Sequence, residues 1–475
     1  MIKLIRFSGS KVFVLFLDCL FIYVSYLLAY NIKFKGMVPA QQWDSFFYYG
    51  PWLGLLTAIT YYFFNLYDFA GRQKPMKWLS NLMLAHLIFV VELIVLHYWL
   101  KTFTLPRSVV IIAFIIQIAL TFTLRLLLFF VQTKGIGKKR ALLVVNGHAS
   151  SVKTLEKLRD QGGIWFDIQR VLLVSNDHHQ ELSVTSWDGI DILVLGHEIP
   201  AVVKTGLIRS AGQRNIEVLM IPDFYELYLM KAELQQIDDL MVYSMMPPEL
   251  TLWERFAKRG IDLVISILLL IITSPVLLLM LIVIPATSSG KALFVQERVG
   301  LHEKIFKVLK FRSMVDNAEK STGPILASAT DSRITRLGKF IRATRIDELP
   351  QLLNVIRGDM SLVGPRPERE FFVAQFKEEL PHYTYRLMVK PGVTGLAQVM
   401  ANYTTSPSDK LRYDMMYIKN YSPLLDLKIL FQTILVVLQR DQSKGLDPAT
   451  SETEVSIEKY LQQSQLEIAA VKESY

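Results

Sequence analysis

The sequence predicts a membrane α-helical bundle followed by two cytoplasmic domains, a Rossmann-like α/β domain and a mainly α domain. Hydrophobic residues make up 51% of the 475 residues, and the mean hydropathy of +0.30 is too high for an ordinary soluble enzyme. Long apolar stretches open the chain, and alternating strand and helix patterns follow them. The only cysteine, Cys19, excludes an internal disulfide and a cysteine zinc site.

Four apolar stretches come first, and each is long enough as a helix to cross a hydrocarbon core of about 30 Å. They occupy residues 12–30, 46–66, 78–100 and 108–131. The first is not a cleavable signal peptide, because its apolar run is long and no small-residue cleavage site follows. Residues 1–135 are therefore predicted to form a domain of four transmembrane helices.

Basic residues predict the orientation of this domain. Most of them lie before the first span, between the second and third, and after the fourth: Lys3, Arg6, Lys11, Arg72, Lys74, Lys77, Lys134, Lys138, Lys139 and Arg140. The other two loops hold Lys33, Lys35, Lys101 and Arg107. The positive-inside rule places both ends of the bundle in the cytoplasm. Arg125, inside the fourth span, is expected to snorkel or to pair within the bundle.

Residues 136–246 have the pattern of a small soluble α/β domain. Strands are predicted at residues 141–145, 192–195 and 216–221, with helices at 150–161 and 202–213. The turn after the first strand, NGHAS, lacks the three-glycine fingerprint of a dinucleotide site. This favours a structural or regulatory role for the domain and leaves nucleotide binding open.

Residues 261–285 are apolar again, and their length alone predicts a fifth span. Ser274 and Pro275 lie at the middle, where proline removes a helical hydrogen bond. Basic residues flank the stretch on both sides, with Lys258 before it and Lys291 after it, which favours two cytoplasmic ends. The sequence therefore predicts a re-entrant helix with a membrane break at Ser274-Pro275. A kinked span is the alternative, since transmembrane helices tolerate proline.

The re-entrant helix belongs to a predicted domain at residues 247–440, and residues 441–475 form a polar tail with a possible helix at 454–471. Between residues 298 and 345 basic residues far outnumber acidic ones: Arg298, Lys304, Lys307, Lys310, Arg312, Lys320, Arg333, Arg336, Lys339, Arg342 and Arg345. Such a cluster suits anionic groups at a membrane, either through specific phosphate clamps or through general attraction to acidic lipids. Nucleic acid is not expected, because aromatic residues are not interleaved with the charges.

A pair of carboxylates follows this basic cluster in residues 345–351, RIDELPQ. Pro350 and Gly358 bound a predicted helix, which places Asp347 and Glu348 at its N-terminus, where the ionised form is favoured. Asp347 is either a helix cap or a carboxylate poised among cations to attack phosphorus. In the second interpretation Glu348 holds a divalent cation that bridges phosphates.

A series of short motifs runs through the same part of the chain. They are KRGID at 258–262, the Ser274-Pro275 pair, QERVG at 296–300, KFRSM at 310–314, residues 342–351, GDMSLVGPRP at 358–367 and KPGVTGL at 390–396. This series, over roughly residues 253–440, resembles the bacterial sugar transferases called monotopic phosphoglycosyl transferases. The whole chain is similar to their large members, the undecaprenyl-phosphate galactose and glucose phosphotransferases. The motif departs at Arg345-Ile346, where many members have a small residue before leucine.

The resemblance implies a reaction in which a hexose 1-phosphate passes from a UDP-sugar to undecaprenyl phosphate and UMP is released. It implies that Asp347 attacks and forms a covalent phosphosugar intermediate, and that Glu348 is a ligand of Mg²⁺. The product would begin the synthesis of a capsule, O-antigen or exopolysaccharide. Galactose and glucose differ at one hydroxyl, and nothing in the sequence separates them.

The resemblance also implies roles for four cations. Arg342 is expected to clamp the lipid phosphate, and Lys310, Arg312 and Arg366 are expected to hold the diphosphate or uridine. The protein is expected in the bacterial inner membrane, among its lipids, with the catalytic domain facing the cytoplasm. A homodimer through the α/β domain is possible.

Two other functions compete with this one. A nucleotide-sugar dehydratase or epimerase in residues 140–246 would need a glycine-rich loop and a Tyr-x-x-x-Lys pair there, and that stretch contains neither. A scaffold or copolymerase that organises export would make the Asp347-Glu348 pair and its cations incidental.

Overall fold

The computed structural model describes residues 8–67, 75–100, 105–131, 138–146, 155, 158, 165–174, 182–184, 187–197, 199–246, 249–315, 331, 333–401, 405–439, 467–468 and 471–473. The chain divides into two compact units. The first contains Met1–Leu219 with Ser456–Tyr475, and the second contains Met220–Val455. The division therefore falls earlier than the predicted boundary at residue 246, and the C-terminal tail belongs with the first unit.

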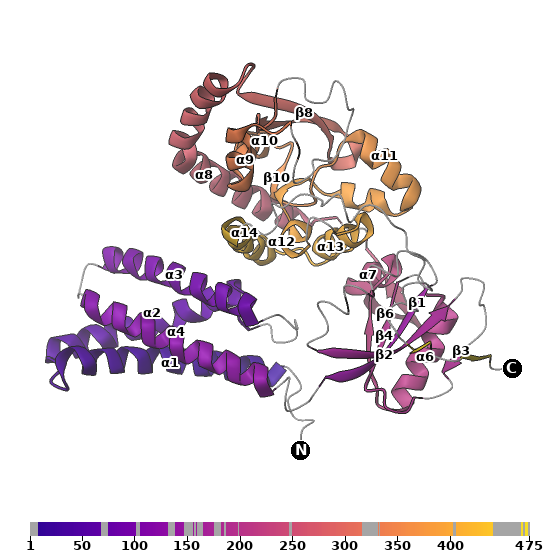
Figure 1. The fold of residues 1–475 in the computed structure, drawn as a ribbon, viewed down its shortest axis with the longest axis horizontal. Helices are drawn as coiled ribbons and strands as arrows, with labels where there is room; N and C mark the ends of the chain where they lie inside the picture. Colours follow the sequence, from indigo (N-terminus) through magenta and orange to yellow (C-terminus); the bar gives the residue numbers. More distant parts are fainter. Residues whose placement is uncertain are drawn as a thin grey trace. The chain divides into compact units, whose positions relative to one another are not determined.

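The first unit begins with four long helices that lie side by side (Figure 1). These are α1 (Ser8–Phe34), α2 (Ala40–Phe63), α3 (Pro75–Leu100) and α4 (Arg107–Phe130). Helices α1 and α3 each pack against both α2 and α4. Among the described residues, α1, α3, α4 and the later helix α8 are long and apolar enough to cross a membrane. Helix α2, the predicted second span, belongs to the same bundle but is not apolar enough to be counted among them.

A buried ion pair joins the first and last helices of the bundle. Arg125 donates to both carboxylate oxygens of Asp18, at 2.7 Å each, and the two residues are 2% and 0% exposed. The Arg125 guanidinium also lies 5.9 Å from the ring centroid of Tyr61, whose hydroxyl lies 3.0 Å from Nε2 of His86. The expectation that Arg125 pairs within the bundle is confirmed, and lipid does not have to accommodate its charge.

The rest of the first unit is an α/β domain. Its sheet has the order β12-β2-β1-β4-β5, and its strands are β1 (Lys139–Asn146), β2 (Phe166–Val174), β4 (Ile192–Leu195), β5 (Glu217–Met220) and β12 (Glu467–Ile468). Strand β1 runs parallel to β2 and β4. Alternate β1 side chains enter two cores, and α6 (Ala201–Gln213) covers the one that contains Leu142 and Val144. The α/β prediction is confirmed, although β2 was not predicted and the Rossmann-like assignment stays a prediction.

The C-terminal tail contributes strands to this domain. Strand β12 pairs in parallel with β2, and β13 (Val471–Glu473) pairs antiparallel with β3 (Leu182–Val184). The helix predicted at residues 454–471 is therefore wrong at 467, 468 and 471, and its other residues lie outside the described part of the chain. Likewise, only Leu155 and Leu158 of the helix predicted at 150–161 are described, and both are helical. By covering β2, the tail protects an edge strand that could otherwise pair with another chain.

The second unit starts with α7 (Phe224–Tyr228), a 3-10 turn η3 (Leu229–Lys231) and a hairpin of β6 (Glu233–Ile237) and β7 (Leu240–Ser244). Helix α8 (Leu252–Thr287) follows and is one uninterrupted helix. Pro275 has no N–H to donate to the carbonyl of Ile271, and Ser274 Oγ donates to that carbonyl instead, at 2.7 Å. The predicted break in helical structure is therefore absent, although α8 changes direction between its ends (Figure 1).

Both ends of α8 bind the same domain. Near its start, Asp262 Oδ1 accepts from the backbone N–H of Leu362 at 3.0 Å. Near its end, Met280 and Ile284 pack against Phe311 and Ile341. The domain therefore holds α8 at two places, while a re-entrant path through a membrane stays a prediction.

The rest of the unit is mainly helical, as predicted, around a hydrophobic core that includes Val308, Leu352, Val355, Leu362 and Met415. Two strands that were not predicted, β8 (Leu293–Val299) and β9 (Ile305–Phe311), form an antiparallel hairpin around the turn η4 (Leu301–Glu303). The remaining elements are α9 (Arg336–Ala343), η5 (Ile346–Glu348), α10 (Gln351–Arg357), β10 (Ser361–Val363), α11 (Glu370–Glu379), η6 (Tyr383–Met388), β11 (Gly392–Thr394), α12 (Leu396–Met400), α13 (Pro407–Lys419) and α14 (Pro423–Gln439).

Candidate active site

The two carboxylates lie in the single 3-10 turn η5, between α9 and α10. Arg345, just before them, has a left-handed backbone with φ of 57°, which costs a non-glycine residue about 1–2 kcal/mol. Strained backbone of this kind occurs where the surrounding structure fixes a functional turn. Gly338 lets α9 approach closely, because a Cβ there would lie 1.9 Å from the carbonyl oxygen of Ser313. Gly338 therefore allows α9, which leads into the turn, to lie close to Ser313.

Asp347 does not cap helix α10. Pro350 occupies the N-cap position, and no side chain makes a capping hydrogen bond there. Asp347 Oδ1 is buried and has no hydrogen-bond partner among the described residues. Leaving a buried acceptor unpaired costs about 1–3 kcal/mol. The capping interpretation is therefore wrong, and Asp347 has an oxygen available for another use.

Glu348 is surrounded by cations from three different segments. Its Oε1 lies 2.9 Å from Nη2 of Arg366, 3.8 Å from Nζ of Lys310 and 3.8 Å from Nη1 of Arg345. Its side chain is only 12% exposed. Burial without these cations would be costly for a carboxylate, so the cations stabilise Glu348 in its ionised form.

The same environment separates the acidities of the two carboxyl groups. Burial, and then the charge of Glu348, raises the pKa of Asp347, although Lys310 and Arg342 oppose the rise. Burial alone would raise the pKa of Glu348 too, but Arg366 and Lys310 outweigh it and hold the pKa well below its usual range. Asp347 is therefore the more basic carboxylate of the two, a property that suits a nucleophile beside a carboxylate that cations keep ionised.

The structure brings together most of the cations that the sequence predicted for the site. Lys310, in β9, and Arg366, after β10, both contact Glu348, and the charge of Arg342, in the last turn of α9, acts on Asp347. Burial lowers the pKa of Lys310 to about 8, with partial compensation by Glu348. These three residues and the carboxylate pair form one charged cluster.

Arg312 lies elsewhere. Its guanidinium donates to the carbonyl oxygen and the hydroxyl of Ser288, at 2.8 and 2.9 Å, and to the carbonyl of Ser289. Arg312 is 9% exposed, and these contacts bind it to the end of α8. Its predicted role in holding the diphosphate or uridine stays a prediction that these contacts do not support.

A small pocket adjoins the carboxylate pair, since Lys310 and Arg366 both line it and both contact Glu348. Arg298, Val308, Gln351 and Pro367 complete its lining. Sequence reasoning did not assign Arg298 or Gln351 to the site, although both stand in motifs, QERVG and RIDELPQ, that it singled out.

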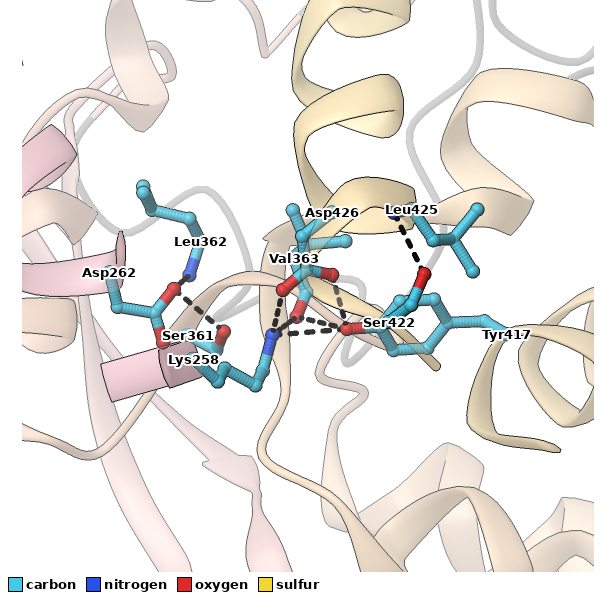
Figure 2. A network of polar contacts seen from close by, with 9 residues as sticks. All are labelled: Lys258, Asp262, Ser361, Leu362, Val363, Tyr417, Ser422, Leu425 and Asp426. Atoms are coloured by element: carbon cyan, nitrogen blue, oxygen red, sulfur yellow. Dashed lines mark hydrogen bonds and ion pairs between the residues drawn. The ribbon is translucent and has the colours of Figure 1, made fainter. Parts of the chain in front are cut away.

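A buried network fixes β10 just before the loop that carries Arg366 (Figure 2). Lys258 Nζ donates to the carbonyl of Val363 at 2.9 Å, to Asp426 Oδ2 at 2.7 Å and to the hydroxyl of Tyr417 at 3.0 Å. Asp262 accepts from the hydroxyl of Ser361 at 3.0 Å. The start of α8 therefore positions one wall of the site.

A second buried ion pair holds the Arg366 loop itself. Arg386 donates to the carbonyl of Arg366 at 2.9 Å and pairs with Asp414 at 2.9 Å. Burial raises the pKa of Asp414 to about 6, although Arg386 opposes the shift. Arg366 thus reaches Glu348 from a loop whose backbone is held by Arg386.

The carboxylate pair fits a Mg²⁺ ion of the kind that substrate phosphates help to bind. The described residues contain no cluster of three or more His, Cys, Asp or Glu side chains that could hold a metal. Mg²⁺ in phosphate chemistry is commonly held by one or two carboxylates, with water and phosphate oxygens as the other ligands. The unpaired Oδ1 of Asp347 beside ionised Glu348 fits that pattern, and Mg²⁺ binding stays a prediction.

Comparisons with known proteins agree with this geometry. The model of a family described as bacterial sugar transferase matches residues 253–440. The UDP-N-acetylgalactosamine-undecaprenyl-phosphate N-acetylgalactosaminephosphotransferase of Aeromonas hydrophila is 40% identical over 227 residues, which are 47% of this chain and 53% of that protein. The UDP-glucose:undecaprenyl-phosphate glucose-1-phosphate transferase of Klebsiella pneumoniae is 30% identical over 315 residues, 62% of this chain and 67% of that protein.

The undecaprenyl-phosphate galactose phosphotransferase of Salmonella typhimurium is 34% identical over 266 residues, which are 52% of this chain and 55% of that protein. The chain thus spans about half the length of the Aeromonas and Salmonella proteins and about two thirds of the Klebsiella protein. The three relatives are named for three different sugars.

Proposed function

Because the chain belongs to the bacterial sugar transferase family, we propose that it transfers a sugar 1-phosphate from a UDP-sugar to undecaprenyl phosphate. The names of the relatives support this reaction class. The observation that carries the proposal is the buried, unpaired Oδ1 of Asp347 beside an ionised Glu348.

In the first half of the reaction, Asp347 attacks the phosphorus that bears the sugar. A bond forms between the carboxylate oxygen and phosphorus, and the bond from phosphorus to the bridging oxygen breaks. The electron pair of that bond leaves on UMP. Both the attacking carboxylate and the donor diphosphate are negative, so Lys310 and Arg366 offset their repulsion and stabilise the leaving charge.

In the second half, a phosphate oxygen of undecaprenyl phosphate attacks the same phosphorus. The bond to Asp347 breaks, the carboxylate is restored, and the product is an undecaprenyl diphosphate sugar. Arg342 acts on the Asp347 carboxyl from the last turn of α9, a place from which it can hold the incoming lipid phosphate. Glu348 would hold a Mg²⁺ ion, which supplies positive charge to bridging phosphates when it is bound.

The membrane places the acceptor within reach of this site. Both ends of α8 are held by the catalytic domain, which supports a re-entrant helix that enters the inner membrane and returns to the cytoplasmic face. A domain anchored in this way meets a lipid phosphate at the interface and a nucleotide sugar from the cytoplasm. The product would begin capsule, O-antigen or exopolysaccharide synthesis. An assay against several UDP-sugars would identify the hexose that is transferred.

The test is an Asp347→Asn variant. The amide keeps the shape of the side chain but is not a nucleophile, so we expect the variant to fold and to lose UMP release. With UDP-sugar alone, mass spectrometry of the wild-type peptide that contains Asp347 should show an added hexose phosphate. Near wild-type UMP release by the variant would overturn the proposed function.

A further inference from the structure

Asn354 is a polar side chain of helix α10 that is completely buried, with 0% of its surface exposed. Its Oδ1 accepts a hydrogen bond from the backbone N–H of Leu309 at 3.0 Å, and its Nδ2 donates to the carbonyl oxygen of Lys307 at 2.8 Å. Both partners belong to strand β9. One carboxamide therefore satisfies a donor and an acceptor of the same strand.

These two hydrogen bonds take the place of a neighbouring strand. Among the described residues β9 pairs only with β8, so its other edge has no strand beside it. Backbone groups of residues two apart in a strand point to the same side, which lets Asn354 bind Lys307 and Leu309 together. A buried backbone group that lost its partner would cost about 1–3 kcal/mol. The edge of β9 is therefore fixed at this point by a side chain of α10.

Asn354 joins the two segments that carry opposite charges at the site. Lys310 follows Leu309 directly in β9, and its Nζ lies 3.8 Å from Oε1 of Glu348. Helix α10 comes just after the turn that carries Glu348. Val308 packs in the same core as α10, but apolar packing has no preferred direction. Hydrogen bonds have preferred distances and angles, so Asn354 fixes where β9 lies along α10.

Helix α10 has other contacts that hold it in place. Arg259, in α8, donates to the carbonyl oxygens of Val355 at 2.7 Å and Ile356 at 2.8 Å. Leu352 and Val355 are buried in the hydrophobic core. Loss of the Asn354 carboxamide should therefore displace β9, and with it Lys310, rather than the helix.

We propose that Asn354 is a positioning residue, which acts through β9 to hold Lys310 against the Asp347-Glu348 pair. The inference rests on the proposed function, in which Lys310 offsets the repulsion between the Asp347 carboxylate and the donor diphosphate. Both hydrogen bonds of the Asn354 side chain are made to the backbone, so its effect on the reaction passes through the strand. A displacement of about 1 Å near the reacting groups can lower the rate about a hundredfold.

The experiment is a double-mutant cycle on kcat/KM for UDP-sugar with Asn354→Leu and Lys310→Met. Leucine has a similar size but neither a donor nor an acceptor. Asn354→Leu alone should lower kcat/KM between about tenfold and a hundredfold. In the Lys310→Met background the same change should lower it about twofold or less, because the ammonium group that Asn354 positions is already absent. Equal losses in the two backgrounds would overturn the inference.

Arg412→Met is the matched control for a loss of stability. Arg412 is a partly buried side chain of the same unit that donates to the carbonyl of Pro222 at 2.9 Å and to Asp409 at 2.7 Å. These contacts involve neither β9 nor α10. Both variants should lower the midpoint of thermal unfolding, but only Asn354→Leu should lower kcat/KM when it is measured well below both midpoints. An equal loss of kcat/KM in Arg412→Met would overturn the inference.

Chemical labelling of Lys310 with an amine reagent tests the geometry without catalysis. Its side chain is 20% exposed, so displacement of β9 in Asn354→Leu should increase its labelling rate several-fold in the absence of substrates. The labelling of Lys339, which is exposed, should stay the same. Mass spectrometry of the labelled peptides measures both rates. Unchanged labelling of Lys310 in the folded variant would overturn the inference.

The two measurements also separate this inference from the proposed function. Faster labelling of Lys310 with unchanged kcat/KM would confirm that Asn354 holds Lys310 in place and would contradict the part of Lys310 in the reaction. If Asn354→Leu does not fold, Asn354→Ser, which retains one hydroxyl group, takes its place in both measurements.

Discussion

Replacing Lys258 by methionine should destabilise the catalytic domain more than any nearby change of surface charge. Lys258 is 8% exposed, and Asp426, its ion-pair partner, is 1% exposed. Methionine has a similar length but no ammonium group. The variant therefore leaves the Asp426 carboxylate buried, with the Tyr417 hydroxyl as its one side-chain donor among the described residues, at 2.8 Å. It also removes a hydrogen bond from the carbonyl of Val363.

The expected magnitude follows from the burial. Removing one partner of a buried ion pair typically costs about 3–5 kcal/mol, because the remaining charge has no compensation. For a domain of this size, 1 kcal/mol lowers the midpoint of thermal unfolding by about 2–4 °C, so we expect a decrease on the order of 10 °C. Asp426→Asn in the same chain should recover much of it, since the amide can bond to Tyr417 and Val363 without a net charge.

The assay is the temperature at which half of the UMP-releasing activity is lost after a fixed incubation. Arg255→Met is the matched control, because Arg255 lies one turn earlier on α8 and its pair with Glu249 is exposed, where ion pairs contribute about 0–1 kcal/mol. If Lys258→Met and Arg255→Met shift this temperature equally, the Lys258 network does not hold the site. The same conclusion follows if Asp426→Asn brings no recovery.

Three further outcomes are expected. Ser274→Ala should lower thermal stability by about 0.5–1.5 kcal/mol, because the carbonyl of Ile271 loses its donor beside Pro275; Ser274→Thr keeps the hydroxyl and should not. Arg312→Lys should lower thermal stability, because contacts with the end of α8 are lost, and should leave the KM for UDP-sugar unchanged. A raised KM at normal thermal stability would instead support the predicted role of Arg312 in substrate binding. Lys310 is charged below its pKa of about 8 and neutral above it, so kcat/KM for UDP-sugar should fall as pH rises through that value, and Lys310→Arg should move the fall to higher pH.

The sequence predicted features whose cause is local. Apolar runs located the long helices, strand patterns located β1, β4 and β5, and Gly358, at φ of 99°, ends α10 as expected. The carboxylate pair was also placed correctly before α10, but the intervening 3-10 turn was not foreseen. That turn depends on the left-handed backbone of Arg345, a conformation that sequence patterns do not predict for arginine.

Features that depend on tertiary contacts could not be predicted. Arg312 and Lys310 are two residues apart in one motif, yet Arg312 binds the end of α8 and Lys310 contacts Glu348. The pairing of β8 with β9 decides that Arg298 faces the pocket and that Lys307 does not. Helix α8 continues through Pro275, and the Ser274 hydroxyl donates to the carbonyl that the proline leaves without a backbone donor, whereas the sequence predicted a break at Ser274-Pro275.

The edge strand β12 has a consequence for the order in which the protein assembles. Strands β1, β2, β4 and β5 leave the ribosome before the entire second unit is made, and Glu467 and Ile468 come after it. At about 5–20 residues per second, the edge of β2 that faces away from β1 remains unpaired for tens of seconds before β12 is made. During that interval newly made chains can associate through the unpaired edge of β2. Pairing of β12 with β2 then covers that edge.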